Sequence, residues 1–272
     1  MKRIAALAVL GLAAGFAMLG LGGVAAAADN ASVSVVHGIP KTPVNVFVNG
    51  KLTLRDFQPG KVAGPLSLPA GSYQVRVFPA ANTAGTGNPV ISATATVPAG
   101  ANVSLVAHLD TAGKPVLTPY VNDVSRSRVA AGQARLVVRH TAAAPAVDVR
   151  AGGTPVVRGL TNPRQQELTV PAGSVRADVV LAGTSTVVIG PATLDLAEGS
   201  ATIVYAVGSA DQKTLGLVVQ TISGLHSAPG GVPAGSGGLA DDGGVPAWLP
   251  VTVAVGLLVA AGGAARLAAT RR

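Results

Sequence analysis

The sequence predicts an all-β protein that consists of two tandem immunoglobulin-like β-sandwich domains followed by a C-terminal transmembrane helix. Three observations carry this prediction: the composition, short alternating segments between turn residues, and one ordered set of motifs that occurs twice. Of the 272 residues, 49% are hydrophobic and 35 are glycine, whereas only 3% are aromatic. Val, Ala and Gly make up most of the apolar residues, and this composition favours short strands and tight turns over long helices.

Short alternating segments fill the middle of the chain. Residues 44–48 alternate and are followed by Asn49-Gly50, a pair that suits the positive φ angles of a type I′ hairpin turn. Residues 73–78 alternate in the same way, as a half-buried strand does. Roughly six to eight such strands in each copy, without helical periodicity, are typical of an immunoglobulin-like sandwich.

The same motifs occur twice, in the same order. His37 and His140 each follow an apolar alternation and precede a strand that ends in a glycine-containing turn. Residues 68–72 (LPAGS) match residues 170–174 (VPAGS). Self-similarity of this kind predicts a duplicated structural unit.

The two ends of the chain carry membrane signals. Lys2 and Arg3 precede an apolar run and the small residues Ala26-Ala27-Ala28, as in a signal peptide cleaved before Asp29. Residues 245–265 contain no charged residue, are long enough to cross a bilayer, and are followed by Arg266, Arg271 and Arg272. These features predict a single-pass type I protein of the cell membrane with its bulk outside; an uncleaved N-terminal anchor is the alternative for the first segment.

The organisation expected from these patterns has seven parts. They are a signal peptide (1–28), a first β-sandwich repeat (29–122), a linker (123–132), a second β-sandwich repeat (133–224), a Gly/Pro-rich flexible tether (225–244), a transmembrane helix (245–265) and a basic cytoplasmic tail (266–272). Residues 249–253 (LPVTV) also resemble the Leu-Pro-x-Thr-Gly signal of sortase substrates, but Val253 stands where that signal has Gly.

The net charge of +8 reflects the ends of the chain. Without Lys2, Arg3 and the three C-terminal arginines, 15 basic residues remain against 12 acidic ones, a net charge of +3. The middle has no cluster of Lys and Arg that could neutralise phosphates, so we expect no nucleic-acid partner. Cysteine is absent, so each domain must be stabilised by its own core.

Three motifs together resemble a known family. They are His37-x-x-Pro40 at a strand end, the Pro-Val-x-Val strand with its Asn-Gly turn at residues 43–50, and Leu-Pro-Ala-Gly-x-Tyr at residues 68–73. In these the chain is similar to domain-of-unknown-function family 4397, over approximately residues 32–222. The second copy is less similar, because Ala143 replaces the proline and Val175 the tyrosine. The resemblance implies exported bacterial β-sandwich modules, often duplicated, with no established activity.

Two pairs of matching polar residues are the best candidates for a specific role. An imidazole at His37 or His140 could bind a metal or sense pH, but zinc needs three or four converging ligands. We therefore expect each histidine to donate a hydrogen bond to a backbone carbonyl of its own domain. Asn45 and Asp148 also match, and without an Asp-rich loop to complete a calcium site we expect them to support turns.

No set of residues indicates catalysis. The sequence has no Gly-x-Ser-x-Gly motif and no cysteine nucleophile, and its acidic residues are few and scattered. Sugar binding would need exposed aromatic rings, but most of the available aromatic residues fall in predicted strands: Phe47, Phe57, Phe78, Tyr73, Tyr120 and Tyr205. We therefore assign no catalytic, cofactor-binding or metal-binding residue.

The function expected from the sequence is that of a non-enzymatic cell-envelope protein. Its two sandwiches would be presented outside the membrane for structural or adhesive contacts with a cell-wall polymer or another surface protein. The alternatives are a binding module for a cell-wall polymer, carbohydrate or small ligand, and an extracytoplasmic enzyme. A deep pocket lined by His37, Asp56 or Tyr73 would favour these alternatives.

Overall fold

The computed structural model describes residues 29–125 and 129–225, and these residues form sixteen β-strands. The strands of the first half are β1 (Ala31–His37), β2 (Val44–Val48), β3 (Lys51–Phe57), β4 (Val62–Leu68), β5 (Gly71–Pro79), β6 (Ile91–Val97), β7 (Asn102–Leu109) and β8 (Pro115–Asn122). Those of the second half are β9 (Gln133–His140), β10 (Val147–Ala151), β11 (Thr154–Leu160), β12 (Gln165–Pro171), β13 (Gly173–Leu181), β14 (Val187–Leu196), β15 (Ala201–Val207) and β16 (Gly216–Ile222).

Each half forms two four-stranded sheets with the same connectivity. The first half has the orders β4-β1-β7-β8 and β3-β2-β5-β6, and the second has β12-β9-β15-β16 and β11-β10-β13-β14. Every strand number in the second half is that of its counterpart raised by eight. The pairs β1–β7 and β9–β15 are parallel, and all other neighbours are antiparallel. The predicted all-β, sandwich-like fold is confirmed.

The immunoglobulin strand order is not the one observed. In an immunoglobulin constant domain the first two strands share a sheet, whereas β1 and β2 lie in different sheets here, as do β9 and β10. The segment between His37 and Val44 carries the chain across to the opposite sheet. A period-2 pattern specifies which face of a strand is buried but not which strands are its neighbours, so the sequence pattern could not identify this order.

The predicted membrane segments lie outside the described residues. This applies to the signal peptide (1–28), most of the tether (225–244), the transmembrane helix (245–265) and the basic tail (266–272). Within the part of the chain that the structure describes, no helix has the length and apolar character needed to cross a membrane.

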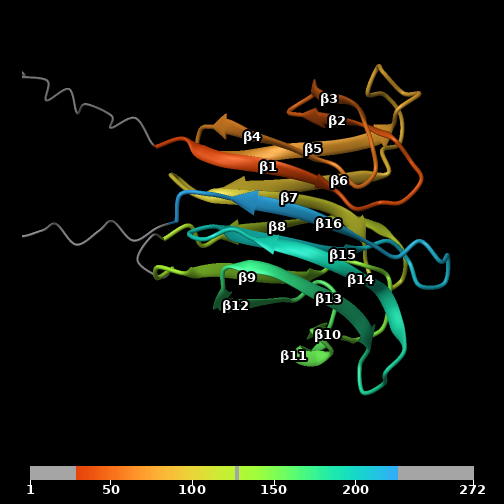
Figure 1. Ribbon diagram of the computed structural model, residues 1–272. Coiled ribbons are helices and arrows are strands. Elements are labelled where there is room, and N and C mark those ends of the chain that lie inside the picture. The colour runs from red at the N-terminus through yellow and green to blue at the C-terminus, as the bar shows by residue number, and fades with distance from the viewer. Residues whose placement is uncertain (1–28, 126–128, 226–272) are drawn as a thin grey trace, which may run out of the picture. The chain divides into compact units, whose positions relative to one another are not determined.

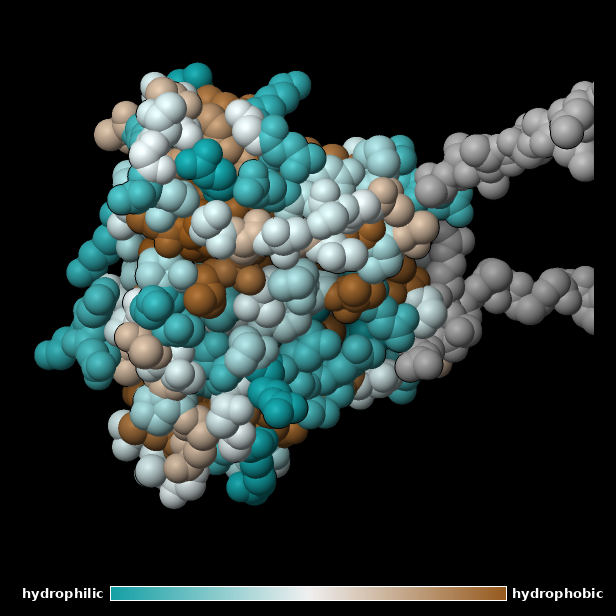
Figure 2. Space-filling model, turned by 180° about the vertical axis from the view of Figure 1, so that it is seen from behind, coloured by the Kyte–Doolittle hydropathy of each residue, from teal (hydrophilic) through white to brown (hydrophobic). Residues whose placement is uncertain are grey.

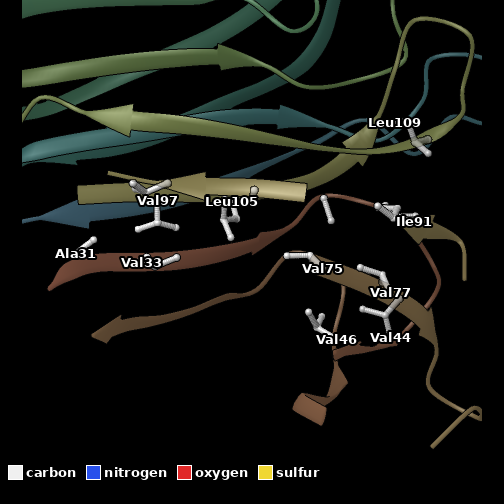
Figure 3. Packing of buried hydrophobic residues seen from close by; sticks show 14 of the residues in the cluster. Ala31, Val33, Val44, Val46, Val75, Val77, Ile91, Val97, Leu105 and Leu109 are labelled. Atoms are coloured by element: carbon white, nitrogen blue, oxygen red, sulfur yellow. The ribbon is translucent and has the colours of Figure 1, made fainter. Parts of the chain in front are cut away.

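A valine-rich core fills the space between the two sheets of each sandwich. In the first sandwich, side chains from β1, β2, β5, β6 and β7 point toward one another, among them Val33, Val46, Val77 and Leu105 (Figure 3). The second sandwich has a separate core of the same kind. Full burial of an aliphatic side chain contributes about 1.5–3 kcal/mol, so these cores stabilise the sandwiches without disulfides.

The two predicted hairpin turns are present. Asn49 and Gly50 have φ angles of 49° and 80°, and Gly152 and Gly153 have 56° and 85°. Two consecutive positive φ angles define a type I′ turn, whose twist matches that of the flanking strands. These turns fix the register of β2 with β3 and of β10 with β11.

Both sandwiches belong to one compact unit; in Figure 1, β1 to β5 lie at the top, β9 to β13 at the bottom, and β7, β8 and β16 overlap between them. A third apolar cluster joins them, contributed by β1, β7 and β8 on one side and by β9, β15 and β16 on the other. Its members are Val36, Val106, Tyr120, Val137, Ile203, Tyr205, Val207 and Val218. The sheets that contain β1 and β9 therefore face each other.

The face shown in Figure 2 carries apolar residues in separate groups divided by polar ones. Large hydrophobic side chains exposed among the described residues are all valines: Val90, Val121, Val156, Val187 and Val219. Scattered exposed apolar residues of this kind are normal for a folded surface.

Candidate functional site at the interface of the two sandwiches

The two matching histidines make the same contacts in both sandwiches. Nε2 of His37 lies 2.9 Å from the carbonyl oxygen of Thr42, and its Nδ1 lies 3.4 Å from the backbone nitrogen of Ile39. Nε2 of His140 lies 2.9 Å from the Pro145 carbonyl oxygen, with a backbone N–H again 3.4 Å from Nδ1. Each ring therefore donates from Nε2 and accepts at Nδ1, and the expected bond to a backbone carbonyl is present.

Burial keeps both imidazoles neutral. It lowers the pKa of His37 and of His140, an effect that the bond to the carbonyl only partly offsets. Because both ring nitrogens already have backbone partners, neither ring has a free lone pair for a metal. Over residues 29–125 and 129–225, no group of three or more His, Asp or Glu side chains is arranged to hold a metal ion.

Asn45 is buried and connects three strands. Its Nδ2 donates to the carbonyl oxygens of Ala80 and Asn82 at 3.0 and 2.9 Å, and its Oδ1 accepts from the backbone N–H of Asp56 at 2.8 Å. The side chain thus joins the end of β5 to the bulge in β3. This is the turn-supporting role expected from the sequence.

Asp148 occupies the matching position, where it only accepts hydrogen bonds, whereas Asn45 both donates and accepts. Its two carboxylate oxygens accept from the backbone N–H groups of Gly159 and Gly183, at 2.7 and 3.1 Å. These two donors, the Gly159 one foremost, lower the pKa of Asp148. The carboxylate therefore stabilises the backbone around Gly159 and Gly183 in its own sandwich, as expected.

The aromatic candidates do not form a stacking platform for sugars. Phe47, Phe78, Tyr120 and Tyr205 are at most 8% exposed, and Phe57 and Tyr73 are partly buried against the first core. The cavities beside the residues of interest are also small: about 20 Å³ next to His37 and about 80 Å³ next to Tyr73. Neither has the volume of a small-molecule site, which is roughly 300 Å³ or more.

The most connected group of polar side chains lies between the two sandwiches, around Arg139 of β9. This side chain is 1% exposed. Its Nη1 donates to the Tyr205 hydroxyl at 2.8 Å, its Nη2 to Oδ1 of Asn122 at 2.7 Å, and its Nε to Oε1 of Gln165 at 2.8 Å. Asn122 belongs to the first sandwich, so the guanidinium joins the two.

Two tyrosine rings flank the same guanidinium. Its central carbon lies 4.2 Å from the ring centroid of Tyr120 and 5.3 Å from that of Tyr205. Burial raises the pKa of Tyr120 to about 12 and lowers that of Arg139, so the phenol stays neutral, and arginine remains protonated in proteins. The arrangement is a cation held between two electron-rich faces, one from each sandwich.

The network continues from Arg139 through uncharged side chains. We call the group formed by Ser104, Asn122, Arg139, Tyr205 and Gln220 the polar seam. Oε1 of Gln220 accepts from the Tyr205 hydroxyl at 2.7 Å and from the Ser104 hydroxyl at 3.0 Å, and Nδ2 of Asn122 donates to the Ser104 oxygen at 3.0 Å. Every member is at most 8% exposed. The polar seam therefore fixes one orientation of the two sandwiches.

Two contacts outside the polar seam support the same interface. The Tyr120 hydroxyl donates to the Pro163 carbonyl oxygen at 2.7 Å, and Nδ2 of Asn162 donates to the carbonyl oxygens of Leu109 and Ala142 at 2.8 and 2.7 Å. These contacts add to the attachment of the two halves at this interface.

The sequence analysis did not single out the polar seam. Val36 holds the position of Arg139 in the first sandwich: it pairs with Val62 and Val106, as Arg139 pairs with Gln165 and Tyr205. One signal was available, because strands buried on both faces read as continuous apolar runs. β15 is buried at all seven positions, and its sequence ATIVYAV does not alternate.

The fold and the polar seam define a class: an all-β protein of paired sandwiches with a buried polar interface. Residues 31–150 match the family model described as "Domain of unknown function (DUF4397)", so this part of the chain is similar to that family. The match includes all eight strands of the first sandwich, continues through β9 and ends within β10. A comparison with curated proteins found no match.

Proposed function

We propose that this chain is a non-enzymatic cell-envelope protein that presents its two β-sandwiches outside the membrane for structural or adhesive contacts. The observation that carries the proposal is the interface between the sandwiches. A buried cation, two flanking tyrosines and a shared apolar cluster join them in one compact unit. A joined pair of this kind suits spacing and contact at a surface.

The sequence signals at both ends support the proposed location at the cell membrane. A signal peptide over residues 1–28, a transmembrane helix over 245–265 and a basic tail over 266–272 make a single-pass type I protein anchored by one helix. The tether over 225–244, rich in Gly, Pro and Ser, would hold the sandwiches away from the bilayer. The recurrence of one strand order supports duplication of a single ancestral unit.

A cleavable tether tests this topology. A recognition sequence for a specific protease is inserted between Gly237 and Gly238, and intact cells are treated with that protease. Release of the two sandwiches into the medium, with the C-terminal tail left in the cell fraction, is the expected result. Cells carrying a scrambled insert are the control, and retention of the sandwiches by treated cells would refute the proposed orientation.

The nature of the contact is tested separately. The purified segment 29–225 is mixed with isolated cell walls and with intact cells that lack the protein, and the bound fraction is measured after sedimentation. Saturable retention by either material supports a structural or adhesive role. Equal retention of a denatured sample would contradict it, because the proposed contact depends on the folded pair.

A further inference from the structure

The second sandwich has an open groove between its edge strands β11 and β12, which belong to opposite sheets. One part of the groove, of about 320 Å³, is lined mainly by apolar side chains, including Val156, Leu168, Val170 and Val175. This volume falls within the roughly 300–1,000 Å³ of small-molecule sites.

The matching place in the first sandwich is nearly closed. Gly71 pairs with Val97 as Gly173 pairs with Leu196, so Tyr73, two residues after Gly71, corresponds to Val175. The cavity beside Tyr73 measures about 80 Å³. The Tyr73 hydroxyl donates to the Pro69 carbonyl oxygen at 2.7 Å, which holds the ring across the opening.

A second difference between matching side chains enlarges the groove further. Val48 pairs with Val75 as Ala151 pairs with Ala177, so a valine in the first cavity corresponds to an alanine in the groove. The difference in volume therefore follows from the side chains present, because the surrounding strands and the Pro-Ala-Gly-Ser turn are the same in both sandwiches.

The other part of the groove is polar and basic. It has a volume of about 470 Å³, and its lining includes Arg158, Arg164 and Gln166. Both arginines are exposed, and neither guanidinium forms a hydrogen bond or ion pair with a described residue. Two uncommitted guanidinium groups beside one opening suit a carboxylate or phosphate.

The acidic groups near these arginines are engaged elsewhere. Asp148 lies close enough to Arg158 to feel its charge, but its two oxygens accept the backbone N–H groups of Gly159 and Gly183. Glu167 pairs with Arg135 at 2.9 Å, and strand alternation places it on the face of β12 opposite to Leu168. The basic part of the groove therefore keeps its net positive charge.

Val156, which is 37% exposed, lines both parts of the groove, so the two parts adjoin at this residue. We propose that the groove binds a single-chain aliphatic anion, with its tail between β11 and β12 and its carboxylate or phosphate at Arg158 and Arg164. This site would add ligand binding to the structural role, and it does not depend on the membrane topology.

Isothermal titration calorimetry on the full chain tests the proposal with four probes. Decanoate and decyl phosphate carry both tail and head group, decanol only the tail, and acetate only the head group. We expect saturable binding of one equivalent of decanoate or decyl phosphate. The affinities for decanol and for acetate should each be lower by about tenfold or more. Equal binding of decanol and the anions, or no binding of either anion, overturns the proposal. A preference between the two anions identifies the head group.

Two variants and one control locate the site. Val175→Tyr should close the groove as Tyr73 closes its counterpart and weaken the better anion about tenfold or more, while Arg164→Gln should weaken the anion but not decanol. Val219→Tyr, on an exposed position of β16 outside the groove, should bind like the unaltered chain. Arg164 is exposed, so its variant tests the site even if Val175→Tyr fails to fold. Unchanged anion binding in Arg164→Gln overturns the assignment.

Discussion

Replacing Arg139 by alanine should destabilise the whole pair of sandwiches and not only the second one. The guanidinium supplies three hydrogen bonds, to Tyr205, Asn122 and Gln165, at 2.7–2.8 Å. Alanine leaves these buried acceptors without their donor and removes the cation between the two tyrosine rings. Because Asn122 and Tyr120 belong to the first sandwich, the loss reaches both halves.

The size of the expected loss in unfolding free energy follows from opposing contributions. A hydrogen bond to a charged group contributes about 1.5–3 kcal/mol, and a desolvated cation–π contact about 2 kcal/mol. Removing the guanidinium also recovers its own desolvation cost, which is several kcal/mol for a buried ion. The difference between these opposing contributions leaves an expected net loss of about 3–5 kcal/mol. Native proteins are stable by about 5–15 kcal/mol, so this would be a large fraction of the total.

Urea unfolding of the segment 29–225, followed by circular dichroism at pH 7.5, measures this loss. With a slope of roughly 2 kcal/mol/M, the midpoint of Arg139→Ala should fall by about 1.5–2.5 M. Arg164→Ala is the matched control, since Arg164 is exposed and forms no hydrogen bond or ion pair with a described residue; its change should stay within about 0.5 kcal/mol. A loss below about 1 kcal/mol for Arg139→Ala would refute the argument.

A double-mutant cycle separates the network from simple loss of packing. Tyr205→Phe removes the hydroxyl that joins Arg139 to Gln220. If the groups act as one network, the double variant should lose less than the sum of the single variants, by about 0.5–3 kcal/mol. Additive losses would mean that Arg139 and Tyr205 contribute independently.

Three further predictions concern the individual sandwiches. The fragment 29–122 exposes Tyr120 and its apolar neighbours, so its urea midpoint should be lower than that of 29–225 and it should self-associate in sedimentation experiments; a monomer of equal stability would contradict a shared core. Burial lowers the pKa of His37 and His140, so stability should be retained above pH 6.5 and fall by up to about 1.4 kcal/mol per pH unit per histidine below it. This slope should be smaller when either is replaced by glutamine. Tyr73→Phe removes one hydrogen bond to the preceding turn, and calorimetry should register a loss of about 0.5–1.5 kcal/mol.

The features that could be predicted from the sequence are local ones. The Asn49-Gly50 turn has the expected pair of positive φ angles, because residue type largely decides which backbone angles a two-residue turn adopts. The bonds of His37 and His140 span only five residues. In each case the partners are close in sequence, so a short motif contains the information.

The interface could not be predicted because it depends on contacts between distant strands. Asn122 and Arg139 are close in sequence, but Ser104 and Gln220 are 116 residues apart. An arginine next to an apolar run would ordinarily be assigned to solvent, since charged residues are rarely fully buried. Only the facing sheet, with its tyrosine and amide groups, makes the buried position of Arg139 favourable.

The two sandwiches share one strand order but differ at the positions that carry specific contacts, and this asymmetry has a physical reason. The acceptors from Tyr205, Asn122 and Gln165 are all used by the guanidinium of Arg139. An arginine at the matching position of the first sandwich would bury a second cation without acceptors, at a cost of several kcal/mol, and Val36 occupies that position instead. The interface thus accommodates one arginine, and the two halves cannot be exchanged. The same reasoning applies to the outer edge, where a tyrosine closes the first sandwich and a valine leaves the second open; two halves with one fold can therefore carry different contacts.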